Sequence, residues 1–141
     1  MAKVGSKAGW SGNYVESVSE AKTLTMGDSG KVYLVTASAA YQITLPTASI
    51  AGAGASYKFL VNAALDGTLG YDVTFSDGES DIMVTHYVDG NNDVVYDADA
   101  DSIAFDSTCV TGDELEFFST GTYWFAKGIG GVNGSFVVTD K

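Results

Sequence analysis

Apolar and polar residues alternate with a period of two over most of the chain. The pattern is clearest in the runs YQITL (41–45), SYKFLV (56–61) and YDVTF (71–75). Successive side chains of a strand point to opposite faces of a sheet, so this alternation is typical of strands with one buried face. The run KVYLVT (31–36) is apolar on both faces, which favours a strand inside a sheet.

Short segments rich in Gly, Asp, Asn and Ser separate these runs and predict tight turns. They include GDSG (27–30), AGAG (51–54), SDGESD (76–81), DGNND (89–93) and STGT (119–122). A turn signal about every ten residues favours a β-sandwich or jelly roll, and 141 residues favour one domain. The sequence therefore predicts an all-β protein: a single jelly-roll-like β-sandwich over residues 22–141, preceded by a short N-terminal arm, residues 1–21.

The arm is polar and rich in Gly and Ser. Its end, SVSEAKTL (17–24), is compatible with a short helix capped by Ser17 or with an extended segment. Two isolated aromatic residues, Trp10 and Tyr14, are candidate anchors that dock on the chain's own body or on a partner. Lys3 and Lys7 make the arm locally basic.

A second aromatic cluster lies in GDELEFFSTGTYWFAKG (112–128), which predicts a hairpin with a turn at 119–122. That turn places Phe118 opposite Tyr123 and Phe117 opposite Trp124. One face, the predicted core face, carries Leu115, Phe117, Trp124 and Ala126. The other face carries Phe118, Tyr123 and Phe125, together with Glu114, Glu116 and Lys127. Such an aromatic patch is seldom left in water, so we expect another segment or another subunit to cover it.

The strongly acidic net charge of the chain argues against some classes of function. The chain has 18 acidic residues against 7 Lys and no Arg, a net charge of −11. An acidic surface without Arg disfavours nucleic-acid binding. The sequence has no apolar run long enough to cross a bilayer, so no membrane partner is expected, and the N-terminus lacks the apolar segment of a signal peptide.

Candidate chemistry is sparse. DGNNDVVYDADAD, Asp89–Asp101, spaces its carboxylates as a calcium loop does, but it lacks the Gly and Glu of an EF-hand. We expect a solvated acidic loop and no metal. Cys109 is expected to be a small core residue, and His86 a packed or interface residue of a strand. No catalytic set and no cofactor motif is evident, so the sequence predicts no enzyme.

Two segments together carry a resemblance to a known family. They are TLTMGDSGKVYLVTASAAYQITLPTASIAGAGASYKFLV (23–61) and GDELEFFSTGTYWFAKGIGG (112–131). This pattern resembles small β-sandwich proteins of tailed bacteriophages, namely capsid decoration (cement) proteins and related head-fibre modules. The resemblance spans about residues 23–131 and rests on turn glycines and core aromatics. It leaves out the arm and the acidic loop.

The resemblance implies a jelly-roll-like homotrimer on the outer capsid surface of the virion, in contact with the major capsid protein. In that setting Phe118, Tyr123 and Phe125 would form the oligomer interface. The arm, with Lys3, Lys7, Trp10 and Tyr14, would contact the capsid. The alternative is a carbohydrate-binding or receptor-binding β-sandwich module of a phage fibre.

Overall fold

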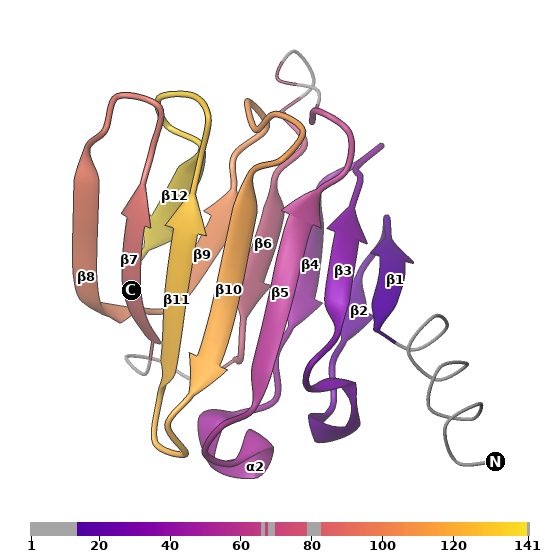
Figure 1. The fold of residues 1–141 in the computed structure, drawn as a ribbon, viewed down its shortest axis with the longest axis vertical. Helices are drawn as coiled ribbons and strands as arrows, with labels where there is room; N and C mark the ends of the chain where they lie inside the picture. The colour runs from indigo at the N-terminus through magenta and orange to yellow at the C-terminus, as the bar shows by residue number, and fades with distance from the viewer. Residues whose placement is uncertain (1–13, 66, 68–69, 79–82, 141) are drawn as a thin grey trace, which may run out of the picture.

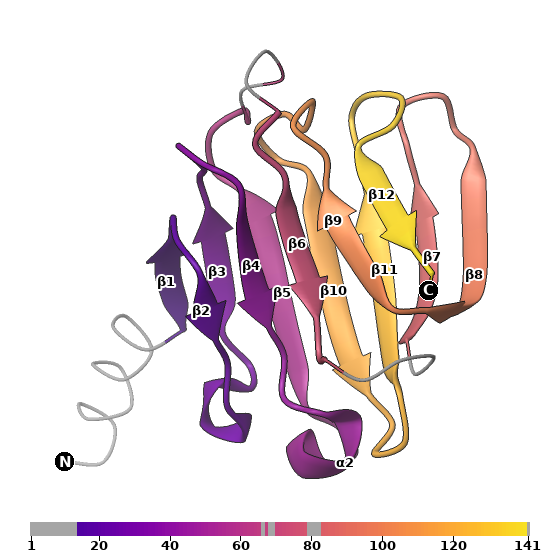
Figure 2. The same cartoon turned by 180° about the vertical axis from the view of Figure 1, so that it is seen from behind.

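A computed structural model describes residues 14–65, 67, 70–78 and 83–140. The strands form two sheets that pack face to face (Figures 1 and 2). The first sheet contains, in spatial order, β1 (Val15–Val18), β3 (Val32–Val35), β5 (Ser56–Val61), β10 (Glu114–Ser119), β11 (Trp124–Ile129), β7 (Met83–Val88) and β8 (Val94–Ala100). The second contains β12 (Phe136–Thr139), β9 (Ser102–Phe105), β6 (Val73–Ser76), β4 (Tyr41–Thr44) and β2 (Lys22–Thr23).

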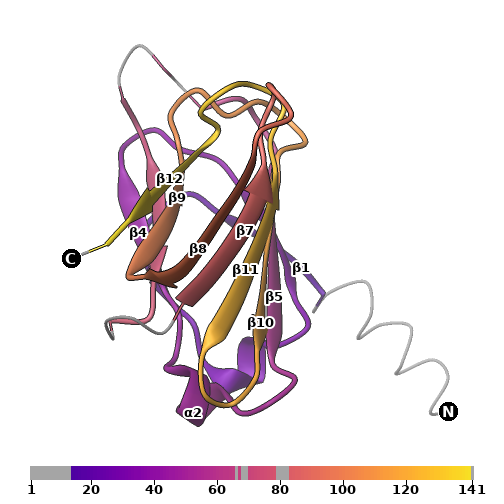
Figure 3. The same ribbon diagram turned by 90° about the vertical axis from the view of Figure 1, so that its left-hand side faces the viewer.

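The prediction of an all-β sandwich is confirmed, and the side view shows its two layers (Figure 3). From β1 to β6 the chain passes from one sheet to the other at every strand. Neighbouring strands within each sheet therefore run parallel in this half of the molecule, as in the pairs β1–β3, β3–β5, β2–β4 and β4–β6. The hairpins β7–β8 and β10–β11 are antiparallel.

Within the described residues, two short helices lie in the connections between strands. A turn of 3-10 helix, η1 (Met26–Asp28), follows β2, and the α-helix α2 (Ala48–Ala51) follows β4. Trp124 Nε1 donates a hydrogen bond to the carbonyl of Pro46 at 3.0 Å, and Ser119 Oγ donates one to the carbonyl of Ala48 at 3.1 Å. These bonds tie the β10–β11 hairpin to the segment around α2.

Between the sheets, the inward residues of the alternating runs form a core rich in aromatic rings. Phe59 lies 4.5 Å from Phe75 between ring centroids, and Phe75 lies 5.3 Å from Phe117. Aromatic pairs at these separations add to the free energy gained from burial. Trp124 and Cys109 are fully buried, as the sequence predicts.

Of the two alternatives predicted for SVSEAKTL (17–24), a short helix or an extended segment, the helix is wrong. Val15–Val18 is the edge strand β1, paired in parallel with β3, and the arm as predicted, residues 1–21, therefore includes a strand of the sheet. Glu16 helps to hold this segment in the sheet, because its carboxylate forms ion pairs with Lys22 at 2.7 Å and with Lys31 at 3.2 Å. The contacts join β1 to β2 of the other sheet and to the start of β3, and they favour an extended segment over a helix.

The predicted register of the β10–β11 hairpin is also wrong. Phe118 lies opposite Phe125 and Phe117 opposite Ala126, so the loop is longer than expected and Tyr123 belongs to it. Ser119 Oγ accepts from Gly121 N, and Thr120 Oγ1 accepts from Tyr123 N, and these bonds stabilise the longer loop. The slip is two residues, an even number, so each side chain keeps its predicted face.

Candidate interaction surface on the seven-stranded sheet

The outer face of the seven-stranded sheet, toward the viewer in Figure 1, brings together the residues singled out in the hairpin. Strand registers align its outward side chains in three rows that cross the sheet. We call them the aromatic, charged and aliphatic rows. They are defined by the pairings of β5, β10, β11, β7 and β8.

The aromatic row contains Phe118 and Phe125, which lie directly opposite each other on β10 and β11. Phe118 is 47% exposed, although it is a large apolar side chain. Tyr123, half-buried in the adjoining loop, packs edge-to-face on Phe125 with ring centroids 5.3 Å apart. The three predicted interface residues therefore lie together on one surface.

The charged row crosses four adjacent strands and contains Lys58, Glu116, Lys127 and His86. Val32 and Tyr96 extend it on either side, and Tyr96 is 68% exposed. Lys58 forms its ion pair diagonally with Glu114, at 3.5 Å. Among the described residues, neither Glu116 nor Lys127 has an ion pair within 4 Å. His86 is exposed in this row and is not packed in the core.

The aliphatic row contains Leu34, Leu60, Ile129, Val88 and Val94, interrupted by Glu114. Ile129 is 60% exposed and Val94 63% exposed. The aliphatic row is not evident in the sequence, because its residues come from strands that are far apart in the chain. Only one part of its signal is present: β3 lies in KVYLVT, the run with apolar residues on both faces.

Two of the shallow grooves formed by the described residues run over this face. One, of about 300 Å³, lies between the charged and aliphatic rows and includes His86, Glu114 and Ile129 in its lining. The other, of about 410 Å³, is lined by Glu116, Phe118, Phe125 and Lys127. Both include Glu116 and Lys127, so these two charges stand on a ridge between two partly apolar hollows.

The outer face of the five-stranded sheet, seen in Figure 2, has a different chemistry. Its outward positions are mostly small and polar, and include Thr23, Gln42, Thr44, Thr74 and Ser76. Such a surface is stable in water without a partner. Of the two outer faces, that of the seven-stranded sheet therefore carries most of the exposed aromatic and long aliphatic side chains, which makes it the candidate contact surface.

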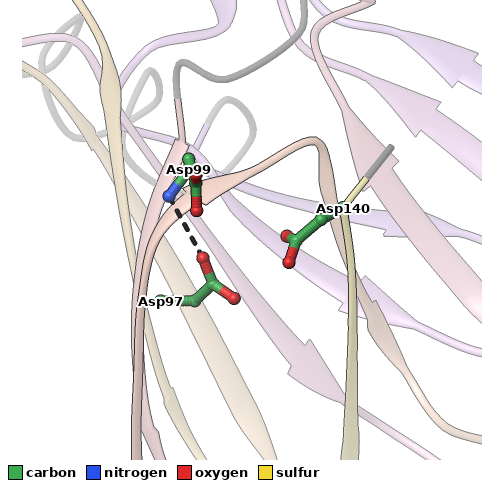
Figure 4. Close-up of side chains that lie close together, drawn as sticks. All are labelled: Asp97, Asp99 and Asp140. Atoms are coloured by element: carbon green, nitrogen blue, oxygen red, sulfur yellow. Dashed lines mark hydrogen bonds between the residues drawn. The ribbon is translucent and has the colours of Figure 1, made fainter.

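Part of the acidic run forms a cluster with a residue from the C-terminal end. Asp97, Asp99 and Asp140 offer carboxylate oxygens within 4.8 Å of one another (Figure 4). Asp97 already accepts a hydrogen bond from the amide of Asp99 at 3.1 Å, so part of this geometry is a local contact within β8. All three are at least partly exposed to water. This is an ordinary arrangement for surface carboxylates, and the described geometry alone does not make a metal site.

Asp89, at the start of the run, has a structural role. Its carboxylate accepts hydrogen bonds from the amides of Gly134 at 3.1 Å and Asn91 at 3.0 Å. These bonds lower the pKa of Asp89, with the Gly134 amide as the largest cause. The residue therefore fixes the β7–β8 turn to the loop before β12.

The remaining candidates differ in what the structure describes. The Cys109 thiol is buried and donates to the carbonyl of Ser135 at 2.9 Å, and burial raises its pKa, which suits a core residue. Tyr14 is 49% exposed, and its carbonyl accepts from the amide of Val32. Lys3, Lys7 and Trp10 lie outside the described residues. In the described part of the chain no helix is long and apolar enough to span a membrane.

Comparison with known proteins adds no family assignment. No family model matches the chain, and no curated protein matches it.

Proposed function

We propose that this protein is a viral structural protein: a capsid decoration (cement) protein that binds the outer surface of a phage head as a trimer. In this role it would stabilise contacts between major capsid proteins. The observation that carries the proposal is the outer face of the seven-stranded sheet. It carries an aromatic row and an aliphatic row, on a protein whose opposite face is mostly small and polar. The resemblance of residues 23–61 and 112–131 supports the same role.

A binding role accounts for the features of this face better than catalysis does. A decoration protein requires a stiff core, a subunit interface and a surface for the shell, and it requires no nucleophile or cofactor. We therefore propose no enzymatic activity. The resemblance implies a jelly-roll-like sandwich, and this remains part of the proposal. It has to accommodate the parallel pairs β1–β3, β3–β5, β2–β4 and β4–β6, and an experimental structure of the assembled protein would test it.

Within this proposal the rows form the subunit interface, and the arm contacts the major capsid protein. Lys3 and Lys7 would speed encounter with an acidic shell surface, and Trp10 and Tyr14 would bury apolar area there. Because β1 begins at Val15, the arm relevant to this contact is shorter than residues 1–21. A truncation should therefore end before β1.

The test combines oligomeric mass with binding to capsids that lack the protein. We expect a mass three times that of the 14.7 kDa chain and saturable binding to the outside of the shell. Deleting residues 1–13, which keeps β1 and Glu16, should preserve the trimer and weaken capsid binding. A matched variant, Gln42→Ala on the polar face, should bind as the full chain does. A monomer at micromolar concentration, or no binding to capsids, would refute the proposal.

A second function is favoured by the groove of about 410 Å³, in which Phe118 and Phe125 lie beside Glu116 and Lys127. Aromatic rings beside charged hydrogen-bonding groups suit a sugar, as in a carbohydrate-binding or receptor-binding module of a phage fibre. A glycan array would separate the two functions. Specific glycan binding by the wild type that Phe118→Ala abolishes would favour the fibre module.

A further inference from the structure

The rows on the outer face are partly self-complementary about the boundary between β10 and β11. Four strands lie on one side of this boundary (β10, β5, β3 and the edge strand β1) and three on the other (β11, β7 and β8), so β1 has no counterpart. We call two residues of one row corresponding when they lie the same number of strands from this boundary on opposite sides. In the charged row, Glu116 corresponds to the oppositely charged Lys127. In the aromatic row, Phe118 corresponds to Phe125.

The correspondence continues farther from the boundary. In the aliphatic row, Leu60 on β5 corresponds to Val88 on β7, and Leu34 on β3 corresponds to Val94 on β8. The correspondence is incomplete. Glu114, which is neutralised within its own chain by Lys58 at 3.5 Å, corresponds to Ile129, and Lys58 itself corresponds to His86. At the third strands of the charged row, Val32 corresponds to Tyr96.

We propose that three copies meet through this face around an axis that runs along the strands and passes over the β10–β11 boundary. The β3–β5–β10 half of each copy then faces the β11–β7–β8 half of the next. Glu116 of one copy pairs with Lys127 of the next copy, and Phe118 packs on Phe125 of the next copy. The inference rests on the trimer of the proposed function and names its interface.

Charge also fits a second copy of this chain as the occupant. Glu116 and Lys127 both line the two grooves and, in the described part of the chain, have no ion pair within 4 Å. Buried charges are stable only when paired, and the neighbour would supply both partners.

Charge reversal tests the pairing without any capsid. We expect Glu116→Lys alone and Lys127→Glu alone to dissociate the trimer, with association weakened roughly tenfold or more and with the effect reduced at high salt. The double variant, Glu116→Lys with Lys127→Glu, should restore the trimer. Gln42→Lys, on the polar face, is the control for added charge and should remain a trimer.

Each single variant also places like charges opposite each other within one chain, so a mixing experiment isolates the contact between chains. Equal amounts of the two single variants, one of them carrying a mass tag, are combined and studied by native mass spectrometry. We expect mixed trimers that neither variant forms alone. Because one contact of any mixed trimer still joins two identical variants, they should be weaker than the wild type.

Four results would overturn the inference. They are single variants that stay trimeric at low salt, a folded double variant that stays monomeric, a mixture that yields no mixed assembly, and a mixture that forms fully stable 1:1 dimers. The last would indicate a twofold axis. A wild type that is a trimer but binds no capsid would leave this interface intact and refute only the decoration function.

Discussion

Truncating Trp124 to Ala should cost more stability than any single change on the outer face. The indole is fully buried. Its ring centroid lies 5.6 Å from that of Tyr57 and 6.5 Å from that of Phe117, and Nε1 donates to the carbonyl of Pro46. Removing a buried aromatic side chain of this size typically costs about 3–5 kcal/mol, because a cavity remains. We expect Trp124→Ala to lie in this range.

A conservative variant separates the two contributions. Trp124→Phe keeps an aromatic ring in the core but removes the hydrogen bond to Pro46, so we expect a loss of about 1–2 kcal/mol. Phe125→Ala, one residue away on the outer face, is the matched control. It removes a ring from the proposed interface and leaves the core between the sheets filled.

The assay is equilibrium unfolding in urea, followed by circular dichroism at two protomer concentrations tenfold apart. A loss of subunit packing lowers the free energy of unfolding at both concentrations. A loss of assembly lowers apparent stability in a way that depends on concentration, because assembly and folding are linked. We expect the first behaviour for Trp124→Ala and the second for Phe125→Ala. A loss below about 1 kcal/mol for Trp124→Ala, or an equal and concentration-independent loss for both, would refute the assignment of their faces.

Three further predictions follow from the outer face, the acidic run and the edge strand. Phe118→Ala and Tyr123→Ala should each weaken the trimer more than the subunit fold, which light scattering and thermal unfolding together would show. EDTA should leave the thermal transition nearly unchanged, because Asp89–Asp101 lacks a complete calcium loop; a large decrease in Tm would contradict this. The hydrogen bond from Lys22 is the largest cause of the lowered pKa of Glu16. A lowered folded-state pKa means that Glu16 stabilises the fold above its unfolded-state pKa of about 4.3 and loses this effect as the pH falls through its folded-state pKa. The stability difference between wild type and Glu16→Gln should therefore shrink in acid, and a difference that grows in acid would be incompatible with it.

Period-two alternation alone determined which side chains lie in the core. In Tyr57, Phe59 and Val61 of β5 it identified buried residues without any knowledge of partner strands. The same alternation assigned the faces of β10 and β11 correctly although their register was wrong. A slip of two residues moves a side chain along a strand but does not turn it to the other face.

The conformation of SVSEAKTL was decided by contacts that a local pattern does not contain. Ser17 and Glu20 have the spacing of a helix cap, and an isolated segment has nothing stronger to oppose it. In the folded chain, β3 offers a free edge to Val15–Val18, and Lys22 and Lys31 lie within reach of Glu16. Tertiary pairing of this kind readily outweighs a capping preference worth about 1 kcal/mol.

The candidate surface likewise has one part that the sequence determined and another that only the tertiary structure decided. The sequence determined its aromatic part, because Phe118, Tyr123 and Phe125 lie within eight positions of the chain and a hairpin must bring them together. Only the tertiary structure decided that Leu34, Leu60 and Val94 extend that surface, since the order of strands in the sheet differs from their order in the chain. Which strands become neighbours depends on long-range pairing. The partial correspondence of side chains about the β10–β11 boundary is a property of that pairing and of no single segment.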